Sequence, residues 1–120
     1  MLYTDTITNI YDSFNARDIE AVLAYFHPSV DWPNGWEGGY VHGHDAVRSY
    51  WTRQWAALDP HVEPSSSELL PDGRLKVEVK QTIKDSSGKL LFTGTVYHVY
   101  TFDHALIRKM EIEEVQTAIQ

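Results

Sequence analysis

The sequence contains no cysteine among its 120 residues. Disulfides, thiolate nucleophiles and cysteine-ligated metal sites are therefore excluded, and a cytoplasmic location is expected. Basic residues are also sparse: ten Lys and Arg are scattered along the chain against 17 Asp and Glu, for a formal net charge of −7. The lack of a basic cluster argues against nucleic acids as partners, because a protein binds them largely by neutralising their phosphates. It also argues against binding to anionic membrane surfaces.

Long apolar runs are missing too, since no stretch approaches the roughly 20 residues that span a bilayer. The opening M-L-Y-T-D-T has neither the basic segment nor the apolar core of a signal peptide. Phosphate-binding loops, dinucleotide fingerprints and serine nucleophile motifs do not occur. Among the six histidines, His42 and His44 form a short pair without a third ligand. We expect a soluble protein with no metal and no organic cofactor, folded as one domain over residues 1–120.

The first half of the chain has the periodicity of amphipathic helices. Its three apolar stripes are Ile7, Ile10, Tyr11 and Phe14; Ile19, Val22, Leu23 and Phe26; and Val47, Tyr50, Trp51, Gln54, Trp55 and Leu58. Asp18 can cap the second helix and Pro28 ends it. The third helix begins after Gly43 and stops at Asp59-Pro60.

The second half alternates between apolar and polar residues, as strands do. Residues 75–84 have this period of two, residues 90–102 are rich in Val, Thr, Tyr and Phe, and residues 106–115 form a last strand. Turn sequences lie at residues 71–73 and 85–88. Helices followed by strands predict an α+β fold, with a few helices lying across a curved, largely antiparallel sheet.

Several segments now show a family resemblance. They are R-D-I-E-A-V at 17–22, F-H-P at 26–28, V-H-G at 41–43, D-A-V at 45–47, Y-W at 50–51, H-V-Y-T-F at 98–102 and I-R-K-M-E-I at 107–112. In these segments the chain resembles the nuclear transport factor 2-like (NTF2-like) superfamily, in its ketosteroid-isomerase-like and polyketide-cyclase-like (SnoaL-like) branch. The resemblance implies a cone-shaped barrel, in which a curved mixed sheet wraps around N-terminal helices and encloses one pocket. It also implies a homodimer.

Ketosteroid isomerase chemistry does not carry over residue by residue. That reaction needs an aspartate base with a tyrosine and a protonated aspartic acid as oxyanion donors. The match places Asn34 at the base position, His98 at the acid position and Ile10 at the tyrosine position, with Tyr11 next to it. Because an amide cannot abstract a proton near neutral pH, a true ketosteroid isomerase is not expected.

His98 is the leading catalytic candidate. It shares a strand face with Val96 and Tyr100, and histidine titrates near neutral pH, so it could serve as a general acid or base. It could equally be a hydrogen-bonded core histidine. A catalytic histidine is commonly oriented by an acid, for which Asp12 and Asp31 are the candidates.

The stretch D-W-P-N-G-W-E-G-G-Y-V-H-G at 31–43 is expected to form the strand and lip of the pocket. Asp31 is the carboxylate nearest to the missing base, but it lies three positions early, so it is either a shifted base or a loop residue. Asn34 is either a ligand-orienting amide or, with Gly35, part of a turn.

The resemblance implies a largely aromatic pocket lining. The candidate ligand-binding residues are Tyr11, Phe26, Trp32, Asn34, Trp36, Trp51, Trp55, Gln81, Tyr100 and Met110. The tryptophans have core packing as their alternative role. Such a lining suits a small apolar or aromatic molecule. Two functions follow: a cofactor-independent isomerase, cyclase or dehydratase, or a non-catalytic ligand-binding or dimeric interaction module.

Overall fold

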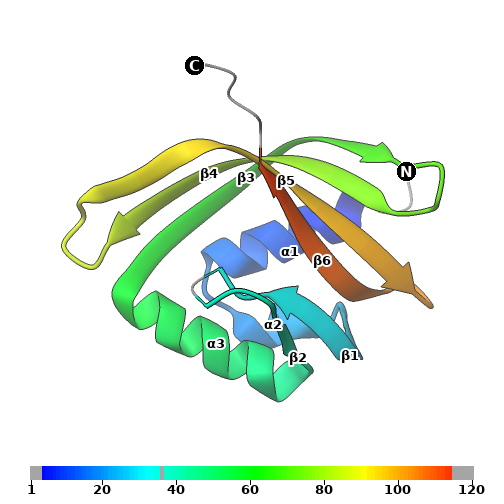
Figure 1. Ribbon diagram of the computed structural model, residues 1–120, viewed down its shortest axis with the longest axis horizontal. Helices are drawn as coiled ribbons and strands as arrows, with labels where there is room; N and C mark the ends of the chain where they lie inside the picture. The colour runs from blue at the N-terminus through cyan, green and yellow to red at the C-terminus, as the bar shows by residue number, and fades with distance from the viewer. Residues whose placement is uncertain (1–3, 36, 115–120) are drawn as a thin grey trace.

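The computed structural model of the protein describes residues 4–35 and 37–114, which form an α+β fold (Figure 1). The helices are α1 (Thr4–Asn15), α2 (Ile19–Leu23) and α3 (His44–Ala57). The strands are β1 (Phe26–Pro33), β2 (Tyr40–His42), β3 (Leu58–Leu69), β4 (Leu75–Asp85), β5 (Leu90–Asp103) and β6 (Leu106–Glu114). None of the helices in these ranges is long and apolar enough to cross a membrane.

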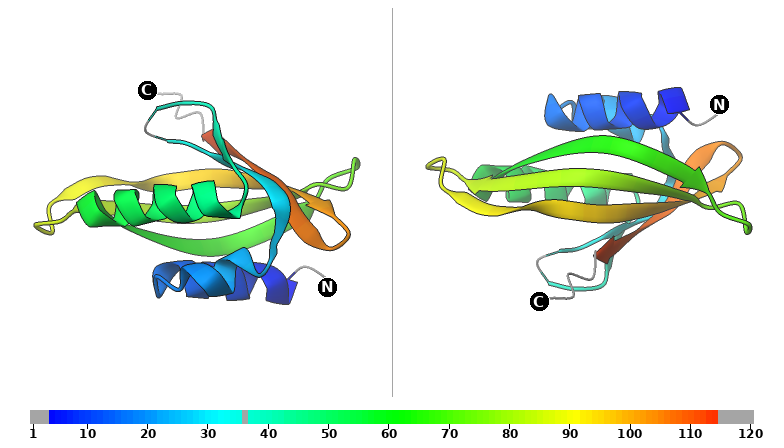
Figure 2. Two further views of the ribbon diagram at one scale, coloured as in Figure 1. Left: turned by 90° about the horizontal axis from the view of Figure 1, so that it is seen from below. Right: turned by 90° about the horizontal axis from the view of Figure 1, so that it is seen from above.

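The strands form one six-stranded sheet in the order β2-β1-β6-β5-β4-β3. All neighbours are antiparallel except β1 and β6, which run parallel. The sheet is curved and does not close into a barrel; its long strands arch over the helices in Figure 1, and Figure 2 shows α1 along one side of these strands. The predicted α+β fold and the curved, largely antiparallel sheet are therefore confirmed.

The second helix is shorter than the sequence predicts. Asp18 does cap it, because its carboxylate accepts a hydrogen bond from the Ala21 amide at 3.2 Å. The helix ends at Leu23, however, and Phe26 is the first residue of β1. The amide of Ile107 in β6 donates to the carbonyl of Tyr25 at 2.8 Å, so pairing with β6 draws the chain into the sheet before Pro28 is reached.

The strand β3 follows α3 without a loop. The sequence predicts the end of α3 at residues 59–60 and a turn at 71–73, but not the bounds of the strand between them. Residues 58–69 pair with β4 along their whole length, with one irregularity between Pro64 and Ser66. Because β3 lies at the edge of the sheet, proline and serine are tolerated there.

Aromatic side chains fill the space between the helices and the sheet. Trp51 on α3 is 1% exposed, and its ring contacts Trp32 edge-on at a centroid distance of 5.2 Å and stacks on Trp55 at 5.5 Å. Phe26 stacks on Trp32 at 5.2 Å. This cluster fixes β1 against α3 and forms the floor of a cavity under the sheet.

Candidate functional site

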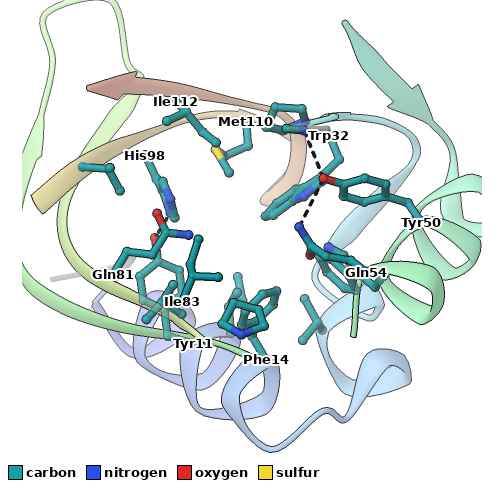
Figure 3. Close-up of a pocket in the computed structure, with 18 of the residues that line it drawn as sticks. Tyr11, Phe14, Trp32, Tyr50, Gln54, Gln81, Ile83, His98, Met110 and Ile112 are labelled. Atoms are coloured by element: carbon teal, nitrogen blue, oxygen red, sulfur yellow. Dashed lines mark hydrogen bonds between the residues drawn. The ribbon is translucent and has the colours of Figure 1, made fainter. Parts of the chain in front are cut away.

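A cavity of about 390 Å³ lies between the helices and the concave face of the sheet (Figure 3). Its lining is mainly apolar and includes Trp32, Trp51, Ile83 and Met110. Among the described lining residues there is no Asp, Glu, Lys or Arg. The lining side chains with polar groups are Tyr11, Tyr50, Gln54, Gln81, His98 and Tyr100, together with the indole N–H groups of Trp32 and Trp51. A ligand in this cavity would meet a neutral surface with a few hydrogen-bonding groups.

Three of these polar side chains form a buried hydrogen-bond chain. The Tyr100 hydroxyl donates to the Tyr11 hydroxyl at 2.8 Å, and the Tyr11 hydroxyl lies 2.7 Å from Nδ1 of His98. Since Tyr11 accepts from Tyr100, its own proton is left for Nδ1 of His98, and a buried hydroxyl proton without an acceptor would be costly. The imidazole proton therefore lies on the other nitrogen, Nε2.

All three members of the chain are uncharged near neutral pH. Burial lowers the pKa of His98 to about 4. Burial, together with the neighbouring Tyr100 hydroxyl, raises the pKa of Tyr11 well above its usual value. Burial likewise raises the pKa of Tyr100, although its hydrogen bond to Tyr11 acts in the opposite direction. His98 is thus a neutral imidazole held by a tyrosine, with no carboxylate partner among the described residues.

Nε2 of His98 faces the cavity. It has no hydrogen-bond partner among the described side chains, and neither has the amide of Gln81. Both side chains belong to the sheet wall of the cavity (Figure 3). Val96 on β5 pairs with Val79 on β4, and because the two strands are antiparallel, His98 lies opposite Val77 whereas Gln81 lies opposite Gly94, four residues away along β5. His98, which contacts Tyr11, forms the polar end of the cavity at α1.

A second polar group lies on the opposite wall (Figure 3). The Tyr50 hydroxyl accepts hydrogen bonds from the Gly35 amide at 3.0 Å and from Nε2 of Gln54 at 3.3 Å. Burial raises the pKa of Tyr50. Tyr50 thereby connects α3 to the segment that follows β1. Tyr50 and Gln54 lie on the apolar stripe of α3, and two polar groups one helical turn apart on such a stripe are the sequence signal for this pair.

The opening of the cavity is marked by lining residues that remain accessible to solvent. Phe92 on β5 is 42% exposed and Ile112 on β6 is 45% exposed. Both are apolar, so a largely apolar ligand would meet a compatible surface on entry.

Asp31 and Asn34 do not line the cavity. The Asp31 carboxylate accepts from Nδ1 of His42 at 2.7 Å and lies 3.4 Å from the guanidinium of Arg108. The hydrogen bond from His42 is the main reason that the pKa of Asp31 is lowered. The Asn34 side chain forms a local turn, donating to the Glu37 carboxylate at 2.9 Å and accepting from the Glu37 amide at 3.0 Å. The predicted roles of Asp31 as a base and Asn34 as a ligand-orienting amide are not supported by these positions.

Two of the predicted aromatic residues lie behind the cavity wall rather than in it. Phe26 is covered by Trp32, and Trp55 packs behind Trp51 with the guanidinium of Arg17 5.0 Å from its ring centre. Trp36 lies outside the described residues. The structure brings the remaining candidates together at the cavity: Tyr11, Trp32, Trp51, Gln81, His98, Tyr100 and Met110. Among the described residues, no group of three or more His, Asp or Glu side chains could hold a metal ion.

Comparison with known proteins agrees with this architecture. A search of curated proteins gave no match. Among solved structures, TerC co-crystallized with polyporic acid has a TM-score of 0.79 and 25% identity, with 95% of this chain and 92% of that chain covered. An NTF2-like protein of unknown function from Burkholderia pseudomallei K96243 has a TM-score of 0.79 and 24% identity, with coverage of 92% and 88%.

A third similar structure is SalBIII, described as an epoxide hydrolase/cyclase-like enzyme in pyran ring formation in the polyether salinomycin. It has a TM-score of 0.77 and 17% identity, with 94% of this chain and 90% of that chain covered. At such identities the likeness to SalBIII and to the Burkholderia protein is one of fold. The family model of the SnoaL-like domain matches residues 7–110. The chain therefore belongs to the SnoaL-like domain family of the NTF2-like superfamily, as the sequence resemblance implies.

Proposed function

We propose that this protein binds a small, largely apolar molecule in the 390 Å³ cavity and converts it without a cofactor, in an isomerase-, cyclase- or dehydratase-type reaction. One observation carries the proposal: a single neutral imidazole, fixed through Nδ1, turns its second nitrogen into a cavity whose described lining has no charged side chain. The co-crystallization of TerC with polyporic acid and the cyclase-like description of SalBIII support the same class of function.

In this function His98 contacts the reacting part of the substrate. Isomerisation, cyclisation and dehydration share steps in which a proton moves or an oxygen gains negative charge, and a group held at that atom lowers the barrier. Gln81, which also lines the cavity, orients the substrate through its amide. Tyr11 does not act on the substrate directly, because its hydroxyl is occupied by His98 and Tyr100. Steroid isomerisation by an aspartate base is not proposed, since no carboxylate is among the described lining residues.

The test begins with a thermal-shift screen of neutral polycyclic and terpenoid compounds, followed by mass spectrometry of each stabilising compound after incubation with the protein. For a compound that is converted, His98→Gln is expected to lower kcat/KM by about 100-fold or more, the range for loss of a positioned group that transfers a proton or stabilises a developing negative charge. The matched control is His61→Gln, which removes an exposed histidine on β3 and should leave kcat/KM unchanged. Full turnover by His98→Gln would exclude the proposed role of His98.

A non-catalytic ligand-binding module is the second candidate. It is favoured by the lack of any carboxylate in the described lining and by the low pKa of His98, about 4, which makes the imidazole a weak base. A compound that stabilises the protein strongly but is recovered unchanged would favour this candidate. The homodimer implied by the family resemblance remains a prediction, and sedimentation equilibrium would test it.

A further inference from the structure

The hydrogen-bond chain at the end of the cavity has a defined direction. Tyr100 donates to Tyr11, and Tyr11 donates to Nδ1 of His98, so the only proton that His98 carries is on Nε2. Hydrogen bonds in such a chain polarise one another, which makes the last donor stronger than an isolated imidazole. The group that the chain presents to the cavity is therefore an N–H donor, without a free lone pair on either ring nitrogen.

The lining around this donor is electrically neutral. The described residues of the cavity include no Asp, Glu, Lys or Arg, and the other polar groups of their side chains are amides, phenols and indole N–H groups, all of them uncharged. A carboxylate brought to this end would lose its water without gaining a cationic partner. A carbonyl or ether oxygen has no such penalty and accepts the hydrogen bond that Nε2 offers.

We propose that the cavity selects uncharged ligands that place a carbonyl or ether oxygen on Nε2–H of His98, and that it discriminates against carboxylates. The inference deepens the proposed function, on whose binding site it rests. In it His98 acts as a neutral hydrogen-bond donor that stabilises negative charge on the ligand oxygen, rather than as a base. Tyr11 and Tyr100 are positioning residues, because they fix the proton on Nε2 without touching the ligand.

Three probes of matched shape test the inference. They are 2-acetylnaphthalene, which has a carbonyl oxygen, 2-isopropenylnaphthalene, in which a methylene replaces that oxygen, and 2-naphthoate. The flat rings match the aromatic wall formed by Trp32 and Trp51. Dissociation constants are measured at pH 7.5, where carboxylic acids are ionised. The naphthoate is expected to bind at least about tenfold more weakly than the ketone, because its charge has no partner.

The variant His98→Leu removes the donor. It should lower the affinity for the ketone relative to the hydrocarbon by roughly threefold to tenfold, which is the net effect of one hydrogen bond. The control Tyr97→Phe, whose hydroxyl interacts with Glu78 at 3.2 Å, should leave this ratio unchanged. Circular dichroism checks that each variant is folded.

A measurement on the unaltered protein keeps the inference testable if the Leu variant does not fold. The ¹⁵N and ¹H shifts of the His98 ring should show a proton on Nε2 and none on Nδ1, and the ketone should shift the Nε2–H signal whereas the hydrocarbon should not. In Tyr11→Phe the His98 tautomer preference should weaken, because Nδ1 loses its donor. A purely structural Tyr11 would leave that signal unmoved.

The outcomes separate this inference from the proposed function. A ketone preference that depends on His98, with a responding Nε2–H signal, supports it. If the ketone and the hydrocarbon show the same affinity ratio in both proteins, or if naphthoate binds as tightly as the ketone, the inference is wrong although the binding cavity stands. If none of the three probes binds, the binding function itself is overturned together with the inference.

Discussion

The hydroxyl of Tyr11 lies 2.7 Å from Nδ1 of His98, a contact between residues 87 positions apart in the chain. Tyr11 is 3% exposed and His98 is 6% exposed, so neither group can readily exchange its partner for water. The contact joins α1 to β5 and holds the imidazole at the end of the cavity. It therefore serves the stability of the fold as well as the orientation of the candidate catalytic group.

Replacement of Tyr11 by Phe should destabilise the protein although the ring is kept. The change leaves Nδ1 of His98 and the hydroxyl of Tyr100 without their partners in a buried site. We expect the free energy of unfolding to fall by about 1–3 kcal/mol, measured by urea denaturation. In Tyr97→Phe, which loses a half-exposed hydroxyl, the change should stay within about 0.5 kcal/mol. Equal effects of the two substitutions would contradict the structural role assigned to Tyr11.

The buried imidazole makes stability depend on pH in a definite direction. Burial lowers the pKa of His98 from its ordinary value of 6.5 to about 4 in the folded protein, so the unfolded chain takes up the proton first as the pH falls. The contribution of His98 to stability is complete above pH 6.5 and is lost as the pH falls toward 4. The loss amounts to roughly 3 kcal/mol. The residues next to His98 on α1, β4, β5 and β6 (Tyr11, Val77, Tyr100 and Ile112) do not titrate in this window.

The difference between the wild-type protein and His98→Gln isolates this effect, because both share all other titrating groups. Urea denaturation at pH 7.5, 6.5, 5.5 and 4.5 should show the wild-type advantage shrinking as the pH is lowered. Parallel pH profiles for the two proteins would show that His98 is not held neutral by burial.

The sequence predicted those elements of the fold whose burial pattern is regular. Residues 75–84 alternate between apolar and polar side chains, and the structure has β4 at Leu75–Asp85. The edge strand β3 carries no such pattern, since residues 63–69 are all exposed and include a proline and three serines. Its pairing depends on the facing strand β4, which is why its bounds could not be deduced from its own residues.

Part of the site is also predictable from a regular pattern. Alternation along β5 placed His98 and Tyr100 on one face, and both line the cavity. The sequence predicts an acid as the partner of His98, with Asp12 as one candidate. Asp12 is exposed, whereas Tyr11, one position earlier on α1, turns inward and contacts His98. Successive residues of a helix point in different directions, so the rotation of α1 about its axis decides whether residue 11 or residue 12 meets the imidazole. The spacing of residues in the sequence does not define this rotation.

Tyr50 should hold the segment after β1 through the Gly35 amide. In Tyr50→Phe this amide loses its acceptor at 3.0 Å, while the neighbouring backbone hydrogen bonds between Asn34 and residues 38–39 remain. Amide hydrogen exchange at Gly35 should accelerate by about fivefold, corresponding to a hydrogen bond of roughly 1 kcal/mol. Tyr25→Phe is the control, since its hydroxyl interacts with Asn9 instead. Unchanged exchange at Gly35 in Tyr50→Phe would exclude this tether.

The two-residue connection between β5 and β6 stores backbone strain that a glycine should relieve. His104 and Ala105 have φ values of 53° and 68°, and Asp103 pairs with Leu106 across the turn. Positive φ at both central positions is the geometry of a type I′ turn, which favours Asn-Gly over His-Ala. We expect Ala105→Gly to raise the free energy of unfolding by about 0.5–1 kcal/mol, because an L-residue in the left-handed region is strained.

The same substitution in a helix provides the matched control. Ala56 lies in α3, where glycine loses more conformational freedom on folding than alanine does, so Ala56→Gly should lower the free energy of unfolding by roughly 0.5 kcal/mol. Urea denaturation of both variants measures the two changes under identical conditions. Opposite signs at Ala105 and Ala56 would separate relief of backbone strain from any general effect of glycine, whereas a loss of stability at both positions would contradict the strained turn.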